Sequence, residues 1–332
     1  MSLPLIDVFA LLDTAAHDHD RQAVGREIDA ACRDSGFFLV TGHGIDPRLR
    51  DDLEALSREF FALPDEAKAA IAMERGGVAW RGWFPVGGEL TSGEPDRKEG
   101  VYFGAELAPT DPRVLGRTPL HGPNLFPEDP ADLRSVVLRW IDAVSALGQT
   151  LLEGVALGLG IERGWFATHL TADPTVLFRI FHYPPGDSDS WGVGEHTDYG
   201  LITLLAQDRN GGLQVRTRGA WVDVPADPYV FVVNIGDMLE KMTGGLYRSN
   251  PHRVRNLSGQ DRLSFPLFVD PSWDARVTPL PEAALTGELC HDVDGDSRWD
   301  GQSVHAWEGV YGDYLTAKVA KVFPQLAAAL RG

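Results

Sequence analysis

The part of the sequence after Pro174 constrains the fold most, because short strand-like runs follow one another there with Gly, Pro, Asp and Asn between them. In the first run, 175–183, every second residue shares one face. That face carries Leu177, Arg179, Phe181 and Tyr183. Further runs lie around His196, at 211–215, 221–224 and 229–235, at Val254 and at 262–269. Such spacing favours an antiparallel sandwich over alternating parallel β-α units. We predict a double-sheet jelly roll, whose mouth can hold a metal.

The rest of the chain predicts helices and a few strands packed around that roll. Leu3–Val8 is expected to be an edge strand and Phe37–Val40 a buried one. Apolar residues recur at helical spacing in four segments, namely 21–33, 46–63, 129–157 and 308–330. The expected fold is therefore mainly β with flanking helices: a double-stranded β-helix (jelly-roll) core, an N-terminal α/β region and a C-terminal helix.

Four segments describe the expected organisation of the chain. They are an N-terminal region of helices and short strands (1–125), a connecting long helix (126–172), the jelly-roll core (173–275), and a C-terminal loop and helix (276–332). Within the first segment, residues 76–123 are rich in Gly and Pro and mix aromatic with charged side chains. This composition is typical of ordered loops that contact a ligand.

Composition excludes several classes of protein. The 332 residues are 43% hydrophobic and 23% charged, as in a soluble globular protein. A formal net charge of −18 argues against a nucleic-acid partner, because phosphates require a basic surface. The two cysteines, Cys32 and Cys290, form no disulfide or zinc pattern, so we expect a cytoplasmic location. No export signal, membrane anchor or obligate protein partner is evident, and the expected partner is a small-molecule substrate.

The motif His196-Thr197-Asp198 places an imidazole and a carboxylate on one face of an extended strand. A second histidine, His252, follows the segment Asn234-Ile235-Gly236-Asp237, a predicted buried strand that runs into a tight turn. Two imidazoles and one carboxylate leave the opposite face of a metal open, which is the arrangement of non-haem Fe(II) oxygenases. We therefore take His196, Asp198 and His252 as candidate metal ligands and catalytic residues.

A candidate anion site follows His252 in the sequence. Arg262 and Ser264 lie two residues apart on one strand face, and they combine a guanidinium fork with a hydroxyl donor. Such a pair suits a carboxylate, because the fork offers two charge-assisted hydrogen bonds. The strand is strongly apolar, so an unpaired arginine there would be costly and a dedicated anion is expected in place of a surface salt bridge.

Together these motifs resemble the Fe(II)- and 2-oxoglutarate-dependent dioxygenases of the isopenicillin N synthase-like family. The resemblance also covers Tyr183-Pro184-Pro185, Gly36-Phe37-Phe38 and Gly42-His43-Gly44, in the right order from Leu3 to about Phe323. It implies a distorted double-stranded β-helix with an N-terminal helical region packed around it. It further implies Fe(II) as cofactor, 2-oxoglutarate and O2 as co-substrates, and oxidation of an unactivated C–H bond of a small molecule by hydroxylation, desaturation or cyclisation, with release of succinate and CO2.

The resemblance also assigns roles to individual residues. It makes His196, Asp198 and His252 the iron ligands, and it gives the distal carboxylate of 2-oxoglutarate to Arg262, Ser264 and Tyr183. One difference is that many plant members have Asn-Tyr-Tyr-Pro where this chain has Phe181-His182-Tyr183-Pro184. The missing amide contact would then come from elsewhere, and Arg179 on the same strand face is the candidate.

Three alternatives remain open at this stage. In isopenicillin N synthase the pair equivalent to Arg262 and Ser264 grips a substrate carboxylate and no 2-oxoglutarate is used, so the motif predicts a carboxylate without identifying it. The chain could therefore be a 2-oxoglutarate-independent Fe(II) oxidase or cyclase. A non-catalytic jelly-roll binding protein is the second alternative. A zinc hydrolase with Glu195 as general base is the third.

Substrate contacts are expected from the loops at the mouth of the roll and from the strand face that carries Arg262. The candidates are Arg81, Tyr102, Phe103, Phe268 and Arg179, with Trp83 and Phe84 as further aromatics. Arg81, in a Gly-rich loop beside two tryptophans, is the first choice for an anionic substrate group. Lys98 and Glu99 are expected to form a structural pair. The acidic stretch 292–296 departs from a calcium loop at its glycine and final ligand, so we expect a solvated loop.

Overall fold

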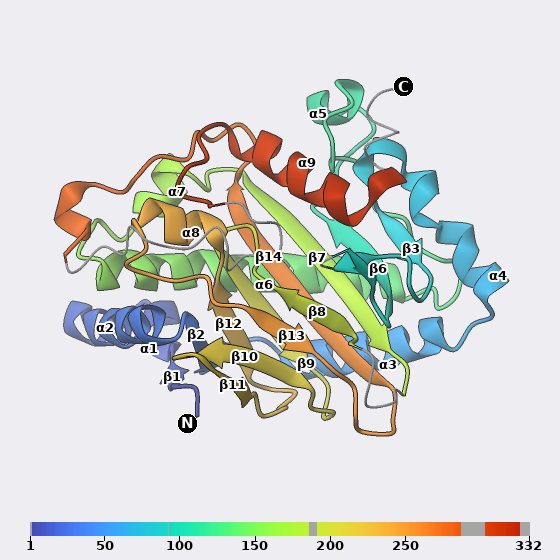
Figure 1. Cartoon of the computed structure of the whole chain (residues 1–332), viewed down its shortest axis with the longest axis horizontal. Helices are drawn as coiled ribbons and strands as arrows, with labels where there is room; N and C mark the ends of the chain where they lie inside the picture. Colours follow the sequence, from blue (N-terminus) through green and yellow to red (C-terminus); the bar gives the residue numbers. More distant parts are fainter. Residues whose placement is uncertain (1, 92, 186–190, 287–302, 326–332) are drawn as a thin grey trace.

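Two β-sheets face each other in the protein, and helices cover the outer surface of the larger one (Figure 1). The computed structural model describes residues 2–91, 93–185, 191–286 and 303–325. The acidic stretch 292–296 lies outside these ranges, as does Cys290. The predicted double-sheet core is confirmed, and the two sheets do not close into a continuous barrel within the described residues.

The large sheet has eight strands in the order β1-β2-β12-β9-β14-β7-β6-β3. Neighbouring strands are antiparallel except β1 and β2, which run parallel. The strands are β1 (Leu5–Asp7), β2 (Phe37–Thr41), β3 (Gly82–Phe84), β6 (Glu99–Gly104), β7 (Pro174–Tyr183), β9 (Ile202–Gln207), β12 (Phe231–Ile235) and β14 (Arg262–Ser272). Because β7 and β14 are the longest strands and lie side by side, their alternating faces extend across most of the sheet.

The small sheet has four antiparallel strands in the order β11-β10-β13-β8. They are β8 (Val193–His196), β10 (Leu213–Thr217), β11 (Ala220–Asp223) and β13 (His252–Val254). A separate hairpin, β4 (Leu90–Thr91) with β5 (Glu94–Pro95), lies close to β8.

Helix α6 (Leu133–Gly158) packs on the face of the large sheet that points away from the small one (Figure 1). Its buried stripe includes Val137, Trp140, Val144 and Leu151, as the helical spacing predicts. Helices α2 (Asp18–Asp34) and α3 (Pro47–Phe61) pack on α6 in turn. None of the helices in the described ranges is long and apolar enough to cross a membrane.

The remaining helical elements are short, apart from the C-terminal helix. They are α1 (Phe9–Leu12), α4 (Asp65–Lys68), α5 (Pro112–Leu115), α7 (Trp165–His169), α8 (Asp237–Met242), α9 (Tyr311–Val322) and the 3₁₀ turns Ala69–Ile71, Met73–Ala79 and Glu282–Ala284. The helix expected at 308–330 is thus shorter, ending at Val322, while residues 326–332 lie outside the described ranges.

The N-terminal segment does not fold apart from the jelly-roll segment. Strands β1, β2, β3 and β6 come from residues before 125, and they extend both edges of the sheet formed by β12, β9, β14 and β7. The core is accordingly one cluster that includes Phe38 from the first segment and Phe265 from the third. The four-segment division of the chain stays a prediction.

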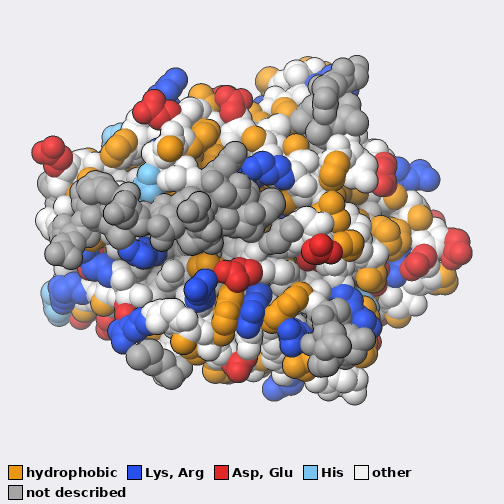
Figure 2. Space-filling view, viewed as in Figure 1, with side chains coloured by type: hydrophobic (Ala, Val, Ile, Leu, Met, Phe, Trp, Pro, Cys, Tyr) orange, Lys and Arg blue, Asp and Glu red, His pale blue; other side chains and the backbone are white. Residues whose placement is uncertain are grey.

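The outer face of the small sheet carries alternating arginine and tryptophan side chains. The Arg253 guanidinium lies 3.8 Å from the ring centre of Trp221 and 4.2 Å from that of Trp191, and Arg255 lies 3.8 Å from Trp191 on its other flank. Figure 2 shows basic and apolar side chains interspersed over this part of the molecule. Cation–π stacking covers the apolar rings with the arginine side chains.

Candidate metal and carboxylate site

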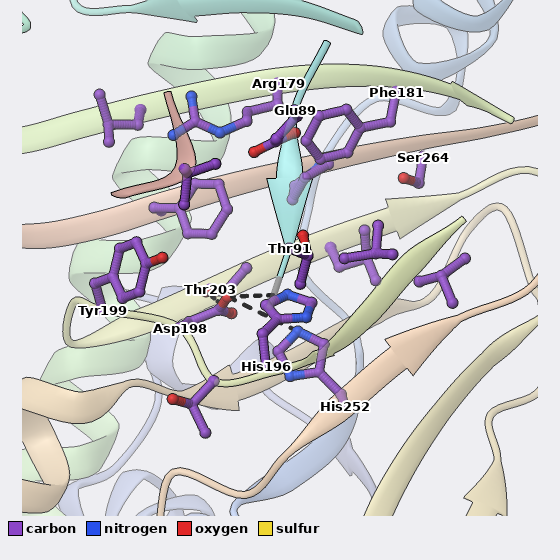
Figure 3. A pocket seen from close by; sticks show the side chains of 18 of the residues that line it. Glu89, Thr91, Arg179, Phe181, His196, Asp198, Tyr199, Thr203, His252 and Ser264 are labelled. Carbon is purple, nitrogen blue, oxygen red and sulfur yellow. Dashed lines mark hydrogen bonds and ion pairs between the residues drawn. The ribbon is translucent and has the colours of Figure 1, made fainter. Parts of the chain in front are cut away.

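Strand pairing brings the two predicted histidine ligands together. Strands β8 and β13 are antiparallel, and their register places His196 directly opposite His252. Side chains that are opposite in an antiparallel pair point to the same face. The two imidazole rings are therefore adjacent, with centres 4.2 Å apart, and both face the large sheet across the cavity (Figure 3).

Asp198 is held by the loop that follows β8. Its backbone carbonyl accepts a hydrogen bond from the Asp237 N–H at the start of α8, at 2.8 Å. Gly236 must pass so close to Gly200 that a Cβ at Gly236 would overlap the Gly200 backbone. This contact between the end of β12 and the Asp198 loop turns the carboxylate back toward the histidines.

The three side chains form a compact cluster of potential metal-ligand atoms. Asp198 Oδ1 lies 4.0 Å from His196 Nε2 and 3.8 Å from His252 Nε2. All three ligand atoms lie within 4.8 Å of one another, and Asp198 and His252 are buried. The arrangement matches the pattern predicted from the sequence.

The protonation states suit metal binding. Burial and the nearby His196 together lower the pKa of His252 to about 4, so the imidazole is neutral near pH 7. Burial raises the pKa of Asp198, but His252 and His196 outweigh that effect and the net pKa is lowered. His196 Nδ1 lies 2.8 Å from the Gly194 carbonyl, which can only accept. Nδ1 therefore carries the proton and the Nε2 lone pair faces the cluster.

Two residues to which the sequence assigned no role at the site orient Asp198. Thr203 on β9 donates to Asp198 Oδ2 at 2.6 Å, and the Asn234 side-chain amide on β12 donates to the same oxygen at 2.7 Å. Because Oδ2 takes both hydrogen bonds, Oδ1 is the oxygen that faces the histidines. Asn234 lay within the predicted Asn-Ile-Gly-Asp strand end, and a polar side chain in such an apolar strand was the available signal.

Arg262, Ser264 and Tyr183 lie together at one end of the cavity, in the interior of the protein. Arg262 is 0% exposed, and it donates from Nε to the Asn210 carbonyl and from Nη2 to Gln207 Oε1. Its Nη1 is buried and has no hydrogen-bond partner among the described residues. The Ser264 hydroxyl lies 3.4 Å from the Tyr183 hydroxyl, and the Tyr183 ring lies under the guanidinium at 4.8 Å.

No carboxylate of the described chain pairs with Arg262. A fully buried guanidinium that keeps an unsatisfied N–H is costly unless an anion completes it. Arg262 thus forms no surface salt bridge, and its Nη1 group is available to bind the predicted carboxylate. This geometry accepts the carboxylate of 2-oxoglutarate and that of a substrate equally well.

The metal cluster and the carboxylate receptor line one cavity of about 1150 Å³, part of it open to solvent. The inward faces of β7 and β14 form much of its wall, as the alternation predicted. From β7 and β14 these lining residues are Leu177, Arg179, Phe181, Tyr183, Arg262, Ser264, Pro266, Phe268 and Asp270. Among the substrate candidates, Arg179, Tyr102 and Phe268 line the cavity.

The expectation that Arg81 binds a substrate anion is wrong. Its side chain is 3% exposed and donates to the carbonyls of Ala105 and Leu120 and to the Asn124 side chain. Burial lowers its pKa to about 10. It is not among the described residues that line the cavity. Arg81 instead fixes the loop that precedes α6.

The aromatic candidates of the N-terminal region divide in the same way. Phe103 stacks between Phe126 and Phe178 in the core, so its assignment to the substrate is wrong. Trp83 donates its indole N–H to Glu99 and Phe84 packs on Tyr102, and neither is among the described lining residues. Only every second residue of a strand can face the cavity, which is why Tyr102 does and Phe103 does not.

Lys98 and Glu99 do not pair with each other, contrary to the expectation. Lys98 faces the cavity and forms ion pairs with Glu89 at 2.8 Å and Asp96 at 2.5 Å. Glu99 points to the other side and binds Lys68 and His182. Neighbouring residues of a strand alternate in direction, so two separate networks form. The signal was the spacing of Asp96 and Lys98, two residues apart.

The zinc hydrolase alternative loses its general base. Glu195 lies between Gly194 and His196 on β8, so its side chain projects from the opposite face of the strand, toward Arg216 at 3.5 Å. It is not among the described residues that line the cavity.

Helix α9 lines a further side of the cavity. Leu315, Val319 and Val322 line it together with Phe323, which directly follows the helix. The Tyr314 hydroxyl donates to Asp237 at 2.9 Å and the Tyr311 hydroxyl to Asp270 at 2.5 Å, so two hydrogen bonds dock the helix. The sequence predicted the helix and its apolar stripe, but it did not predict that the stripe faces the site.

The chain is similar to known oxygenases over nearly its whole length. Residues 174–271 match the 2OG-Fe(II) oxygenase superfamily, and residues 3–129 match the N-terminal region described as "non-haem dioxygenase in morphine synthesis". In Dictyostelium discoideum, a "Probable iron/ascorbate oxidoreductase" is 44% identical over 349 residues, covering 98% of this chain and 95% of that protein. A 1-aminocyclopropane-1-carboxylate oxidase of that organism is 35% identical over 358 residues, covering 97% and 95%.

A solved structure supports both the fold and the co-substrate. It is the crystal structure of a full-length Neurospora crassa protein in complex with alpha-KG (2-oxoglutarate) and thymine. The two chains superpose with a TM-score of 0.79 and 26% identity, covering 96% of each. The fold predicted from the strand pattern is thus found in a protein crystallised with 2-oxoglutarate.

Proposed function

Because this chain belongs to the 2OG-Fe(II) oxygenase superfamily, we propose that His196, Asp198 and His252 are its Fe(II) ligands and that Arg262 and Ser264 hold 2-oxoglutarate. The protein is an Fe(II)- and 2-oxoglutarate-dependent oxygenase that oxidises a small molecule. The residue assignment rests on one observation. The His–Asp–His cluster shares a cavity with a buried guanidinium that has no anion of its own.

The donor set fits Fe(II). Two imidazole nitrogens and one carboxylate oxygen face a common point, and the opposite side of that point opens into the cavity. When bound, Fe(II) with O2 and 2-oxoglutarate supplies an oxidant able to break an unactivated C–H bond. Gly194, Thr203 and Asn234 fix the orientation of the ligands before the metal arrives.

The carboxylate receptor fits the distal carboxylate of 2-oxoglutarate. Arg262 Nη1 offers a buried charge-assisted hydrogen bond, and the hydroxyls of Ser264 and Tyr183 lie beside it. Apolar side chains such as Leu205, Val193 and Phe268 line the same cavity and exclude water from it. These residues bind and orient the co-substrate.

Many family members have an Asn where this chain has Phe181, and in this proposal Arg179 does not take over the contact that the Asn amide makes. Arg179 lies beside Tyr102 and Glu89. Tyr183 is four residues further along β7, and Arg262 on β14 pairs with Tyr183. Arg179 is therefore assigned to the substrate side of the cavity. The relative named for 1-aminocyclopropane-1-carboxylate supports a small molecule that carries both an amino and a carboxylate group.

Anaerobic reconstitution tests the proposal. Fe(II) and 2-oxoglutarate together should produce a charge-transfer absorption band, and O2 with a substrate should then yield succinate. Arg262→Met should weaken the band's dependence on 2-oxoglutarate without loss of iron. An iron-binding protein that gives neither band nor succinate across a substrate library would instead be a 2-oxoglutarate-independent oxidase, or a binding protein if no substrate is oxidised.

The cytoplasmic location and the absence of nucleic-acid, membrane or obligate protein partners remain part of the proposal. The buried, free Cys32 supports a reducing compartment, because a thiol with no described partner needs no oxidising environment. Cell fractionation with an antibody against the chain checks the location.

A further inference from the structure

Arg179 presents a guanidinium to the cavity without any hydrogen bond or ion pair to the described part of the chain. It is half-buried on β7, and its guanidinium lies against two aromatic rings. The guanidinium carbon lies 3.4 Å from the centre of the Tyr102 ring and 5.2 Å from that of Phe268. Such a group keeps all its hydrogen bonds available for a ligand.

Surrounding residues hold this guanidinium in place. The Tyr102 hydroxyl donates to Glu89 Oε1 at 2.5 Å, and Glu89 in turn pairs with the buried Lys98. The carboxylate of Glu89 is thereby used on both oxygens. It keeps the Tyr102 ring fixed beneath Arg179, and Figure 3 shows Arg179 and Glu89 on the side of the cavity away from His196 and His252.

Asp270 is the second polar group of the cavity with unused capacity. It is 2% exposed, and Oδ2 accepts a hydrogen bond from the Tyr311 hydroxyl at 2.5 Å, while Oδ1 has no hydrogen-bond partner in the described part of the chain. The Oδ1 atom lies against Gly200, where any Cβ would overlap it, so it is next to the loop that carries Asp198. A buried carboxylate oxygen without a donor requires one from a ligand.

The two groups are close enough to influence each other. Asp270 on β14 and Arg179 on the adjacent β7 interact electrostatically, and both line the same cavity as the metal cluster. One offers a fork for an anion and the other an acceptor for a cation. Neutral or singly charged ligands would leave one of them unsatisfied.

We propose that the substrate is a small amino acid whose carboxylate is bound by Arg179 and whose ammonium group is bound by Asp270. This assignment rests on the proposed function, since it takes the metal cluster and the Arg262 receptor to be occupied by Fe(II) and 2-oxoglutarate. Arg179 and Asp270 then determine specificity. They orient the amino acid on the open side of the metal cluster.

Binding to the wild-type protein provides the first test. Isothermal titration without O2, on protein loaded with Fe(II) and 2-oxoglutarate, would use the common protein amino acids and 1-aminocyclopropane-1-carboxylate as probes. For the probe that binds best, the methyl ester removes the anionic charge and the des-amino acid removes the ammonium. Each should bind roughly tenfold to a hundredfold more weakly, because each loses a charge-assisted interaction.

Variants assign the two losses to the two residues. Arg179→Gln should weaken binding of the amino acid by that factor and leave binding of the methyl ester unchanged. Asp270→Asn should weaken binding of the amino acid and leave binding of the des-amino acid unchanged. Arg216→Gln, on the small sheet with its side chain 45% exposed, is the matched control and should bind like wild type. Circular dichroism and melting temperature check that each variant folds.

Three results would overturn the proposal. They are no binding by any amino acid probe, equal binding of the amino acid and both analogues by wild type, or equal weakening of all three ligands in Arg179→Gln. The Fe(II)–2-oxoglutarate absorption band is recorded in the same samples. If the band forms and these results appear, only the substrate assignment fails; if wild type forms no band, the proposed function fails.

Discussion

Each end of the cavity contains an arginine, but the two are prepared in different ways. Arg262 is fully buried, and hydrogen bonds from Nε and Nη2 fix the direction of Nη1, which has no hydrogen-bond partner among the described residues. Arg179 is half-buried and is positioned by ring stacking on Tyr102, with no hydrogen bond to the described chain. A rigid fork suits a ligand that never changes, such as a co-substrate. A stacked guanidinium keeps its N–H groups available and suits the substrate.

Arg81 shows what distinguishes either of them from a structural arginine. Its Nη1 and Nη2 groups donate to Ala105, Leu120 and Asn124, and its side chain is not among the described residues that line the cavity. Burial alone therefore does not identify an anion site. The unpaired donor does, together with a cavity in front of it.

Removing the metal cluster between the two ends should have the largest effect. His196→Ala should lower iron affinity by more than about 100-fold, since even residues that only support metal ligands contribute about 10–100-fold. Iron content after gel filtration and succinate production measure the result. The exposed His19→Ala serves as control. Retained iron in His196→Ala would show that the cluster is not the metal site.

The comparison of the two arginines predicts that only the variant of Arg262 weakens the binding of 2-oxoglutarate. Arg262→Met should raise the 2-oxoglutarate concentration for half-saturation by about 100-fold, because buried charge-assisted hydrogen bonds contribute about 1.5–3 kcal/mol each. Arg179→Gln should leave that concentration unchanged. Titration of the anaerobic absorption band measures both. Equal shifts in the two variants would mean that the ends do not have separate ligands.

Asn234→Ala should have an intermediate effect on the metal end alone. Loss of the amide donor frees Asp198 Oδ2 to rotate, so iron affinity should fall about 10-fold to 100-fold. The binding of 2-oxoglutarate to iron-saturated protein should change far less. Competition with a chelator measures the iron affinity. A variant with unchanged affinity would show that Thr203 alone orients the carboxylate.

The smallest expected effect concerns the pH dependence of stability at the substrate end. The pKa of Asp270 is raised to about 7, because burial and the charge of Asp198 outweigh the lowering effects of Tyr311 and Arg179. The folded state thus binds this proton more tightly than the unfolded state. The stabilisation is complete below the unfolded pKa of about 4 and is lost as pH rises through about 7.

Between pH 6 and pH 8, wild type should therefore lose about 1 kcal/mol of stability relative to Asp270→Asn, since one pKa unit corresponds to about 1.36 kcal/mol. Thermal unfolding of both proteins at the two pH values measures the difference. Asp223→Asn, on the small sheet, is the control. An identical pH trend in wild type and Asp270→Asn would contradict the raised pKa.

Much of the site followed from residue spacing. The period of two along β14 predicted that Arg262, Ser264 and Phe268 share a face, and it extends to Asp270, which the same reasoning could have included. The helical spacing in α6 and α9 predicted their buried stripes. Local periodicity is sufficient in these cases, because it depends only on the backbone geometry of one element.

Long-range pairing could not be predicted in the same way. His196 meets His252 through the β8–β13 register, which depends on every turn between them. The resemblance to a family supplied that link. Asn234 and Thr203 both donate a hydrogen bond to the same oxygen of Asp198, and this likewise depends on the β12–β9 pairing.

By itself the sequence determined the chemical types of the site and the strand faces that carry them: a histidine and a carboxylate two residues apart, and an arginine and a hydroxyl at the same spacing. Only the tertiary structure decided which arginines have N–H groups available to bind an anion. Arg81 and Arg179 both lie among aromatics and could each have bound an anion. The difference is that backbone carbonyls from distant loops reach Arg81 and none in the described chain reaches Arg179, and such contacts exist only once the chain has folded.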